Sequence, residues 1–106
     1  MSDFQTVCSV DDLVKSSGVA VLVDGQQIAI FYIDGQVFAI GNYDPIGKAN
    51  LLSRGITGSI GDDLVVASPL YKQHYNLKTG ACLEDEAVSV PVYESKLENG
   101  SVSIKI

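Results

Sequence analysis

One stretch of this chain decides its fold: residues 68 to 80 read SPLYKQHYNLKTG. A second stretch, AIGNYDPIG at residues 39 to 47, begins another long segment between apolar runs. Both segments interrupt a succession of short apolar runs, and both are long for hairpin loops. Long loops in a compact domain are usually functional or derived from something functional. We therefore expect any site to lie in Gly41–Gly55 and Ser68–Gly80, called the first and the second loop below.

Outside the two loops, the chain consists of short apolar and β-branched runs. Tight-turn pairs such as Asp24-Gly25 and Asn99-Gly100 separate them, and such pairs are a strong signal for β-hairpins. Residues 101–106 alternate strictly between polar and apolar, which is typical of a half-buried strand. The pattern predicts an all-β domain of short antiparallel strands at Phe4–Val7, Val19–Val23, Gln27–Ile33, Val37–Ile40, Thr57–Ile60, Leu64–Ala67, Val90–Lys96 and Ser101–Ile106.

One short helix is expected near the start of the chain. Ser9 can cap a helix over Val10–Lys15, and Asp11 and Asp12 would occupy its first turn, where negative charge is favoured. The apolar residues of this segment recur at helical spacing. No other segment carries a comparable helical pattern.

Length and charge limit the possible classes of protein. The 106 residues leave room for one domain, residues 1–106, and thirteen acidic against seven basic residues give a net charge of -6. An acidic chain lacks the basic face that nucleic acid or an anionic membrane requires, and weak steering of a basic partner is the alternative to a merely solvated surface. The first residues do not resemble a signal peptide, so we expect a cytoplasmic protein. Cys8 and Cys82 are then expected as reduced, buried thiols, with a disulfide as the alternative.

The two loops resemble the cluster-binding loops of Rieske iron–sulfur proteins. In that family the first loop carries Cys-Pro-His and the second Cys-Pro-x-His-Gly, followed by an aromatic residue and Thr-Gly. The prolines, the aromatic residue at Tyr75 and the Thr-Gly pair are present here. The four ligand positions are occupied by Asp44, Ile46, Ser68 and Tyr71. The resemblance implies a Rieske-like β-sandwich or barrel of short antiparallel strands.

The chemistry of those four residues excludes the Rieske cluster. A Rieske [2Fe–2S] centre needs two thiolates on one iron and two imidazoles on the other. Ile46 has no lone pair, Ser68 and Tyr71 are poor iron ligands at neutral pH, and Asp44 alone is a single carboxylate. The remaining Cys and His residues do not restore the spacing. We predict no catalytic, cofactor-binding or metal-binding residue in this chain.

A Rieske-like fold without ligands resembles one family in particular, the small subunits of assimilatory NAD(P)H-dependent nitrite reductase. The resemblance extends over nearly the whole chain, including the Asp-Asp-Leu segment at residues 11–13, the Thr-Gly-x-Cys-Leu segment at residues 79–83 and Val-Pro-Val-Tyr at residues 90–93. It implies a non-catalytic subunit, inactive alone, that associates with a large subunit. In that family the large subunit carries FAD, a [4Fe–4S] cluster and sirohaem and reduces nitrite to ammonia. Two alternatives are a free-standing interaction module of another oxidoreductase and, third, an electron carrier.

Four loop residues are candidates for the partner interface: Tyr43, Ile46, Tyr71 and His74. Tyrosine is favoured at interfaces because it buries area and keeps a polar group. For Tyr71 and Tyr75 the alternative is that they fill space once occupied by a cluster.

Two other interpretations concern polar residues. His74 can instead brace its loop or pair with Cys82. Asp44, Asp62 and Asp63 together suggest an acidic metal site. The alternative is that they are turn residues, because all three stand in turn sequences.

Overall fold

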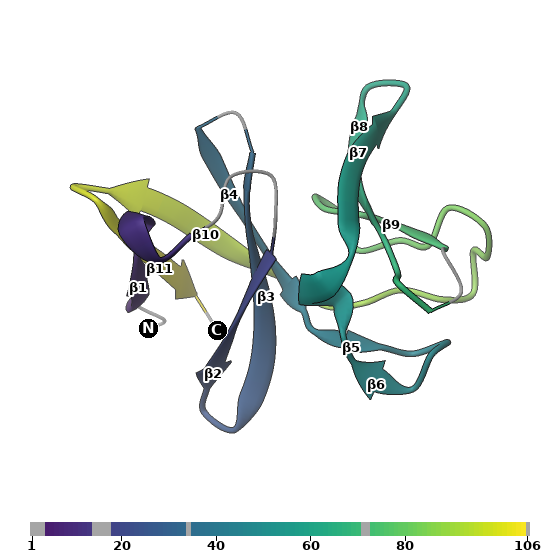
Figure 1. Cartoon of the computed structure of the whole chain (residues 1–106), viewed down its shortest axis with the longest axis horizontal. Helices are drawn as coiled ribbons and strands as arrows, with labels where there is room; N and C mark the ends of the chain where they lie inside the picture. Colours follow the sequence, from purple (N-terminus) through teal and green to yellow (C-terminus); the bar gives the residue numbers. More distant parts are fainter. Residues whose placement is uncertain (1–3, 14–17, 34, 71–72, 106) are drawn as a thin grey trace.

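The computed structural model describes residues 4–13, 18–33, 35–70 and 73–105, and within them the fold is almost entirely β (Figure 1). Three antiparallel sheets have the strand orders β1-β11-β10-β4-β3-β2, β5-β6 and β7-β8-β9. The strands are β1 (Gln5–Ser9), β2 (Gly18–Val23), β3 (Gln26–Ile33), β4 (Gln36–Gly41), β5 (Tyr43–Asp44), β6 (Ala49–Asn50), β7 (Ile56–Ile60), β8 (Asp63–Ala67), β9 (His74–Asn76), β10 (Val92–Glu98) and β11 (Ser101–Lys105).

All eight strands expected from the sequence are present, with ends that differ by one or two residues. Three further strands, β5, β6 and β9, lie within the segments expected as loops. Each has only two or three residues, so it carries no readable periodicity and exists because a neighbouring strand pairs with it. The predicted all-β, Rieske-like fold is confirmed, with the loops more structured than expected.

The hairpin turns follow the sequence signals. Asp24 and Gly25 have φ angles of 50° and 80°, and Asn99 and Gly100 have 53° and 79°. Positive φ at both central residues is the requirement of a type I′ turn, which matches the twist of the flanking strands. These turns set the register of β2 against β3 and of β10 against β11.

The core has two parts because β3 and β4 are buried on both faces. On one face, residues such as Phe31 and Ile40 pack against loop residues including Leu52 and Tyr75. On the other face, Ile30 and its neighbours pack against Val102 and Ile104 of β11. The first cluster therefore connects the two loops to the six-stranded sheet. Figure 1 shows β5, β6 and β9, the strands of the loops, on one side of that sheet.

The expected helix is shorter than predicted. Ser9 caps it with a reciprocal capping box to Asp12, but the helix is a single 3₁₀ turn, Val10–Asp12, and Leu13 is already extended. Leu13 packs against the second core cluster, so tertiary packing ends the helix there. Val14 and Lys15 lie outside the described residues. A second 3₁₀ turn, Leu52–Arg54, was not expected.

Two properties of the described residues bear on the remaining expectations. Cys8 and Cys82 are free thiols rather than a disulfide; Cys82 is buried, Cys8 half-buried. Burial, aided by the nearby Asp12 charge, raises the pKa of Cys8. No helix in the described part of the chain is long and apolar enough to span a bilayer.

Candidate functional site

The fold brings the two loops into direct contact at Asp44 and Ser68. Asp44 ends β5 in the first loop, and Ser68 follows β8 at the start of the second. Both side chains are almost fully buried, and the Ser68 hydroxyl donates a hydrogen bond of 2.5 Å to Asp44 Oδ2. These are the two positions that the resemblance matched to the cysteine ligands. The structure thus places them side by side, joined by a hydrogen bond.

The Asp44 carboxylate is the acceptor at the centre of a buried network. Gln73 Nε2 lies 2.9 and 3.0 Å from its two oxygens, and the Tyr75 hydroxyl donates to Oδ1 at 2.9 Å. The backbone NH of Ile46 donates to the same oxygen at 3.0 Å. A buried carboxylate is tolerated only when it is paired or hydrogen-bonded. Here several donors from both loops supply that compensation.

These donors set the ionisation of Asp44. Burial acts to raise its pKa, but hydrogen bonds from the Ser68 hydroxyl, the Gly47 and Ile46 backbone and the Tyr75 hydroxyl outweigh burial. The pKa of Asp44 is consequently held below its ordinary value. Asp44 is therefore a carboxylate at neutral pH.

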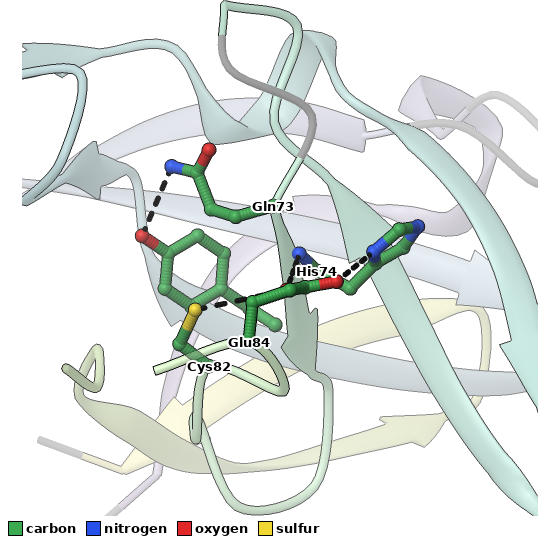
Figure 2. A network of polar contacts seen from close by, with 5 residues as sticks. Gln73, His74, Cys82 and Glu84 are labelled. Carbon is green, nitrogen blue, oxygen red and sulfur yellow. Dashed lines mark hydrogen bonds and ion pairs between the residues drawn. The ribbon is translucent and has the colours of Figure 1, made fainter. Parts of the chain in front are cut away.

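Gln73 connects the network to the second loop. Its Nε2 also lies 3.3 Å from the Tyr75 hydroxyl, a contact drawn in Figure 2. The amide nitrogen faces the carboxylate because Asp44 accepts only. The Oε1 atom of Gln73 is then left buried without a hydrogen-bond partner in the described part of the chain.

The first loop is held around Asp44 by its own backbone. Asn42 is buried; its Oδ1 accepts from the Ser53 NH at 2.7 Å, and its carbonyl accepts from Leu51 and Leu52. A Cβ at Gly47 would lie 2.8 Å from Asp44 Oδ2, so only glycine allows this approach without a shift. These contacts hold the first loop close around the carboxylate.

The residues at the four former ligand positions do not fit a [2Fe–2S] cluster. The oxygens of Asp44 and Ser68 are bonded to each other, and Gln73 and Tyr75 fill the adjoining space with further hydrogen bonds. Ile46 offers no ligand atom, and its half-buried side chain packs against the first core cluster. Tyr71 lies outside the described residues. The buried hydrogen-bond network thus includes both residues that the resemblance matches to the cysteine ligands of a Rieske centre.

Tyr75 fills the core, as one of the two interpretations of this residue predicted. Its side chain is fully buried in the first core cluster. Burial is the main cause that raises its pKa well above the ordinary value; the hydrogen bond to Asp44 and its charge act in the same direction, against the Gln73 bond. Tyr75 therefore stays a neutral phenol at physiological pH.

His74 braces its loop through Glu84, a contact drawn in Figure 2. Its Nδ1 lies 2.6 Å from Glu84 Oε2, and its backbone NH donates to Oε1 at 2.7 Å. The pKa of Glu84 is lowered, first by that backbone bond. Cys82 also contacts Glu84, at 3.8 Å, rather than His74. A bracing role for His74 is therefore the interpretation that the geometry supports.

The three aspartates considered as a metal site do not come together in the structure. Asp62 lies in the turn between β7 and β8 and Asp63 begins β8. Both are exposed, whereas Asp44 is buried, so the three do not form an acidic metal site. In the described ranges no group of three His, Cys, Asp or Glu side chains is arranged to hold a metal ion. Asp44 serves instead as the hydrogen-bond acceptor of the loop network.

Of the three predicted interface residues that the structure describes, Tyr43 is the exposed one. Its side chain is 49% exposed and lines an open groove of about 410 Å³. Uncharged residues line the groove: Leu22, Gly25, Gln26, Gln27, Gly41, Tyr43, Pro45, Asn50, Ser89, Val90, Pro91 and Tyr93. Tyr43 is therefore accessible to a partner, whereas Ile46 packs against the first core cluster.

Sequence reasoning missed Gln73 and Glu84. Gln73 donates to the buried carboxylate and Glu84 anchors His74, yet neither stands in a pattern that signals these roles. The only available sign for Gln73 was its place two residues before Tyr75, because side chains two positions apart in extended backbone point to the same side.

Comparison with known proteins agrees with this geometry. The family model described as a Rieske-like [2Fe-2S] domain matches residues 3–105. A curated relative from Salmonella typhimurium, "Nitrite reductase (NADH) small subunit", is 44% identical over 99% of both chains. The solution NMR structure of the nitrite reductase [NAD(P)H] small subunit from Erwinia carotovora superimposes with a TM-score of 0.83 at 50% identity, covering 100% of this chain and 83% of that one.

A third match has a different arrangement. The "Nitrite reductase [NAD(P)H] large subunit" of Klebsiella oxytoca contains a segment 36% identical to 93% of this chain, which makes up 10% of that protein. In that protein a domain like this one is therefore part of the same polypeptide as the large subunit.

Proposed function

The chain belongs to the Rieske-like family and, within it, to the nitrite reductase (NADH) small subunits, and from this we propose that it is the non-catalytic small subunit of an NAD(P)H-dependent nitrite reductase. It associates with a separate large subunit, which reduces nitrite to ammonia. FAD, a [4Fe–4S] cluster and sirohaem belong to that large subunit. We expect both subunits in the cytoplasm.

The observation that carries the proposal is the hydrogen bond between Ser68 and Asp44 at the two former cysteine positions. A small subunit that relayed electrons would need ligands there. A buried carboxylate with Ser, Gln and Tyr donors instead rigidifies the tip of the fold without redox chemistry. The role that remains for such a domain is to bind the large subunit and stabilise it.

The Klebsiella protein supports the choice of partner. A domain like this one lies there within a large-subunit chain, so the two parts are produced together and held at high effective concentration. When the domain is a separate chain, the same association must come from a non-covalent interface. We place that interface at the loop end, with Tyr43 and the uncharged groove beside it as its exposed part.

Coexpression tests the proposal. The chain is produced with the nitrite reductase large subunit of the same organism and passed over a size-exclusion column while the visible spectrum is recorded. Elution of the chain with the sirohaem absorbance, together with a colourless chain when it is produced alone, is the expected result. Separate elution at micromolar concentrations of both proteins overturns the proposal and leaves an interaction module of another oxidoreductase.

A control identifies the role of the chain in the complex. Activity of the large subunit is measured with and without the chain, and the chain alone is assayed for nitrite reduction. The chain alone is expected to be inactive. A brown chain that contains iron and passes electrons to the large subunit contradicts the assignment of a non-redox subunit.

A further inference from the structure

The groove lined by Tyr43 carries no charge, although the chain as a whole is acidic. None of the described residues that line it is charged, whereas the chain has a net charge of -6. A charged side chain that entered this groove would lose hydrating water without gaining an ion-pair partner, which is costly. A partner segment that fills the groove is therefore expected to be uncharged.

A relay of hydrogen bonds fixes the side-chain amide of Gln27, an exposed residue that lines the groove. The backbone NH of Ser53 donates to Asn42 Oδ1 at 2.7 Å, so the nitrogen of the Asn42 amide is the atom left to donate. Asn42 Nδ2 donates to Gln27 Oε1 at 3.1 Å. The oxygen of Gln27 is thereby occupied, and its Nε2 remains as a donor without a hydrogen bond to the described residues.

Gln26, which also lines the groove, has the same arrangement. The Tyr93 hydroxyl donates to Gln26 Oε1 at 3.0 Å, and Gln26 Nε2 makes no hydrogen bond within the described ranges. The two glutamines thus have donors to offer, while their acceptors are already engaged. An ordinary peptide segment brings backbone NH groups as well as carbonyls, whereas proline brings the carbonyl alone. Proline therefore suits this pair of side chains.

The apolar part of the lining is aromatic and proline-rich. It includes Tyr43, Tyr93, Pro45 and Pro91, and the Tyr43 side chain is 49% exposed. Grooves lined by aromatic residues are a recurring receptor for polyproline II segments. Such a segment has no internal hydrogen bonds, so its carbonyl groups are free to accept from a receptor. The groove thus combines an aromatic wall with unengaged amide donors.

We propose that this groove binds an uncharged, proline-containing segment of the large subunit in the polyproline II conformation, with carbonyl groups of the segment accepting from Gln26 and Gln27. The identity of the partner rests on the proposed function; the chemistry of the segment rests on the two amides and the uncharged lining. A polyproline II segment is preformed, so it loses little conformational entropy on binding.

Decaproline with blocked ends is the first probe, because it adopts polyproline II, carries no charge and has no backbone NH. The peptide is titrated into the isotopically labelled chain while NMR signals of the side-chain amides are recorded. Saturable shifts of the Gln26 and Gln27 amide signals are expected, with a dissociation constant below about 1 mM. A blocked Gly-Ser peptide of equal length is flexible and brings backbone NH groups, and we expect it to bind at least about tenfold more weakly.

Gln27→Glu tests the donor directly. The new carboxylate still accepts from Asn42 Nδ2, but it replaces the amide donor with an oxygen that repels the carbonyls of the segment. The dissociation constants for decaproline and for the large subunit are each expected to rise at least about tenfold. Gln36→Glu adds the same charge at an exposed position outside the groove, and it is expected to change both constants less than about threefold.

Three results overturn the inference: decaproline that shifts neither glutamine amide, a Gly-Ser peptide that binds as tightly as decaproline, or Gln27→Glu that binds like the original chain. Shifts of the same amide signals with rising chain concentration, in the absence of peptide, would show that a second copy fills the groove and would overturn it as well.

Coelution with the large subunit tests the proposed function separately. If the chain coelutes but decaproline does not bind, the inference about the groove fails and the proposed function stands. If decaproline binds but the chain elutes apart from the large subunit, the proposed function fails, and with it the large subunit as the source of the segment.

Discussion

The Ser68 hydroxyl and the Asp44 carboxylate, 24 positions apart in the chain, are joined by a buried hydrogen bond of 2.5 Å. The two residues stand at the positions that the resemblance matches to the cysteine ligands of Rieske proteins, and the contact between them is made by two oxygens. The surrounding donors complete the network, with Gln73 and Tyr75 bonded to the same carboxylate. Asp44, Ser68, Gln73 and Tyr75 therefore form a structural joint between the two loops.

Removing Ser68 from this joint should destabilise the fold measurably. Ser68→Ala deletes a hydrogen bond to a buried charged group, and we expect the free energy of unfolding to fall by about 1.5–3 kcal/mol. Asp44→Ala leaves the Ser68, Gln73 and Tyr75 donors without an acceptor and should cost more, about 3–5 kcal/mol. Urea denaturation followed by circular dichroism measures both.

Ser89→Ala is the matched control for that series. Ser89 is exposed and makes no side-chain hydrogen bond with the described residues, so the change should stay within about 0.5 kcal/mol. If Ser68→Ala were as mild as Ser89→Ala, the buried network would not stabilise the loops.

Acid should weaken the same joint, and Asp44→Asn should not show this effect. The pKa of Asp44 is lower in the folded chain than in the unfolded one, where it is about 3.9. The resulting stabilisation is complete above the unfolded value and is lost as pH falls through the folded pKa. We expect the stability difference between the original chain and Asp44→Asn to be constant from about pH 7 to 5 and to shrink below about pH 4.

Urea midpoints of the two proteins, measured at each pH, test this. Both proteins retain Glu84, whose pKa is also lowered, so its contribution cancels in the difference. A difference that stays constant down to about pH 2 would show that the Asp44 carboxylate contributes nothing by its charge.

Alkali should act through Tyr75 in the opposite sense. Burial raises its pKa in the folded state above the unfolded value of about 10. This stabilisation is complete below the unfolded pKa and is lost as pH rises toward the folded pKa. We expect one of the five tyrosines to ionise late, together with unfolding, in an ultraviolet absorbance titration.

Tyr75→Phe should remove that late step and leave the ring packing in place. Its loss of stability, about 1–2 kcal/mol for the hydroxyl, should be smaller than the loss of about 3–5 kcal/mol expected for the cavity in Tyr75→Ala. A late ionisation that persisted in Tyr75→Phe would have to come from another tyrosine.

Much of the fold could be predicted because its signals are local. Asp24-Gly25 and Asn99-Gly100 specify their hairpins through positive φ, and Ser9 with Asp12 specifies a helix start. The extent of that helix could not be predicted, because it ends where Leu13 packs into the core. The pairing of β1 with β11, between residues far apart in sequence, likewise has no local signal.

The position of the candidate site could be predicted from the sequence, but the hydrogen bonds between its residues could not. Asp44 and Ser68 were identified because they stand where a family motif requires cysteine. The hydrogen bond between them depends on the paths of two loops through space. The donor role of Gln73 depends on the position of the residue just before β9 relative to the carboxylate. A glutamine in a polar loop gives no sign of burial. The network is visible only in three dimensions.

Tyr43 and His74, two of the predicted interface residues, should contribute unequally to binding of the large subunit. Tyr43 is 49% exposed beside an uncharged groove, and exposed tyrosines that enter a partner's pocket are frequent binding hot spots. His74 is engaged with Glu84, and its side chain supports the second loop. We expect Tyr43→Ala to weaken binding of the large subunit about tenfold or more, and His74→Gln to change it less than about threefold.

Surface plasmon resonance with immobilised large subunit measures these affinities, and urea midpoints confirm that both variants remain folded. Tyr32→Phe serves as a conservative tyrosine control, because Tyr32 packs against the second core cluster rather than the groove. Equal binding by Tyr43→Ala and the original chain would place the interface elsewhere on the fold. A strong loss in His74→Gln with Tyr43→Ala unaffected would move it to the face formed by β9 and Glu84, since those are the elements that His74 joins.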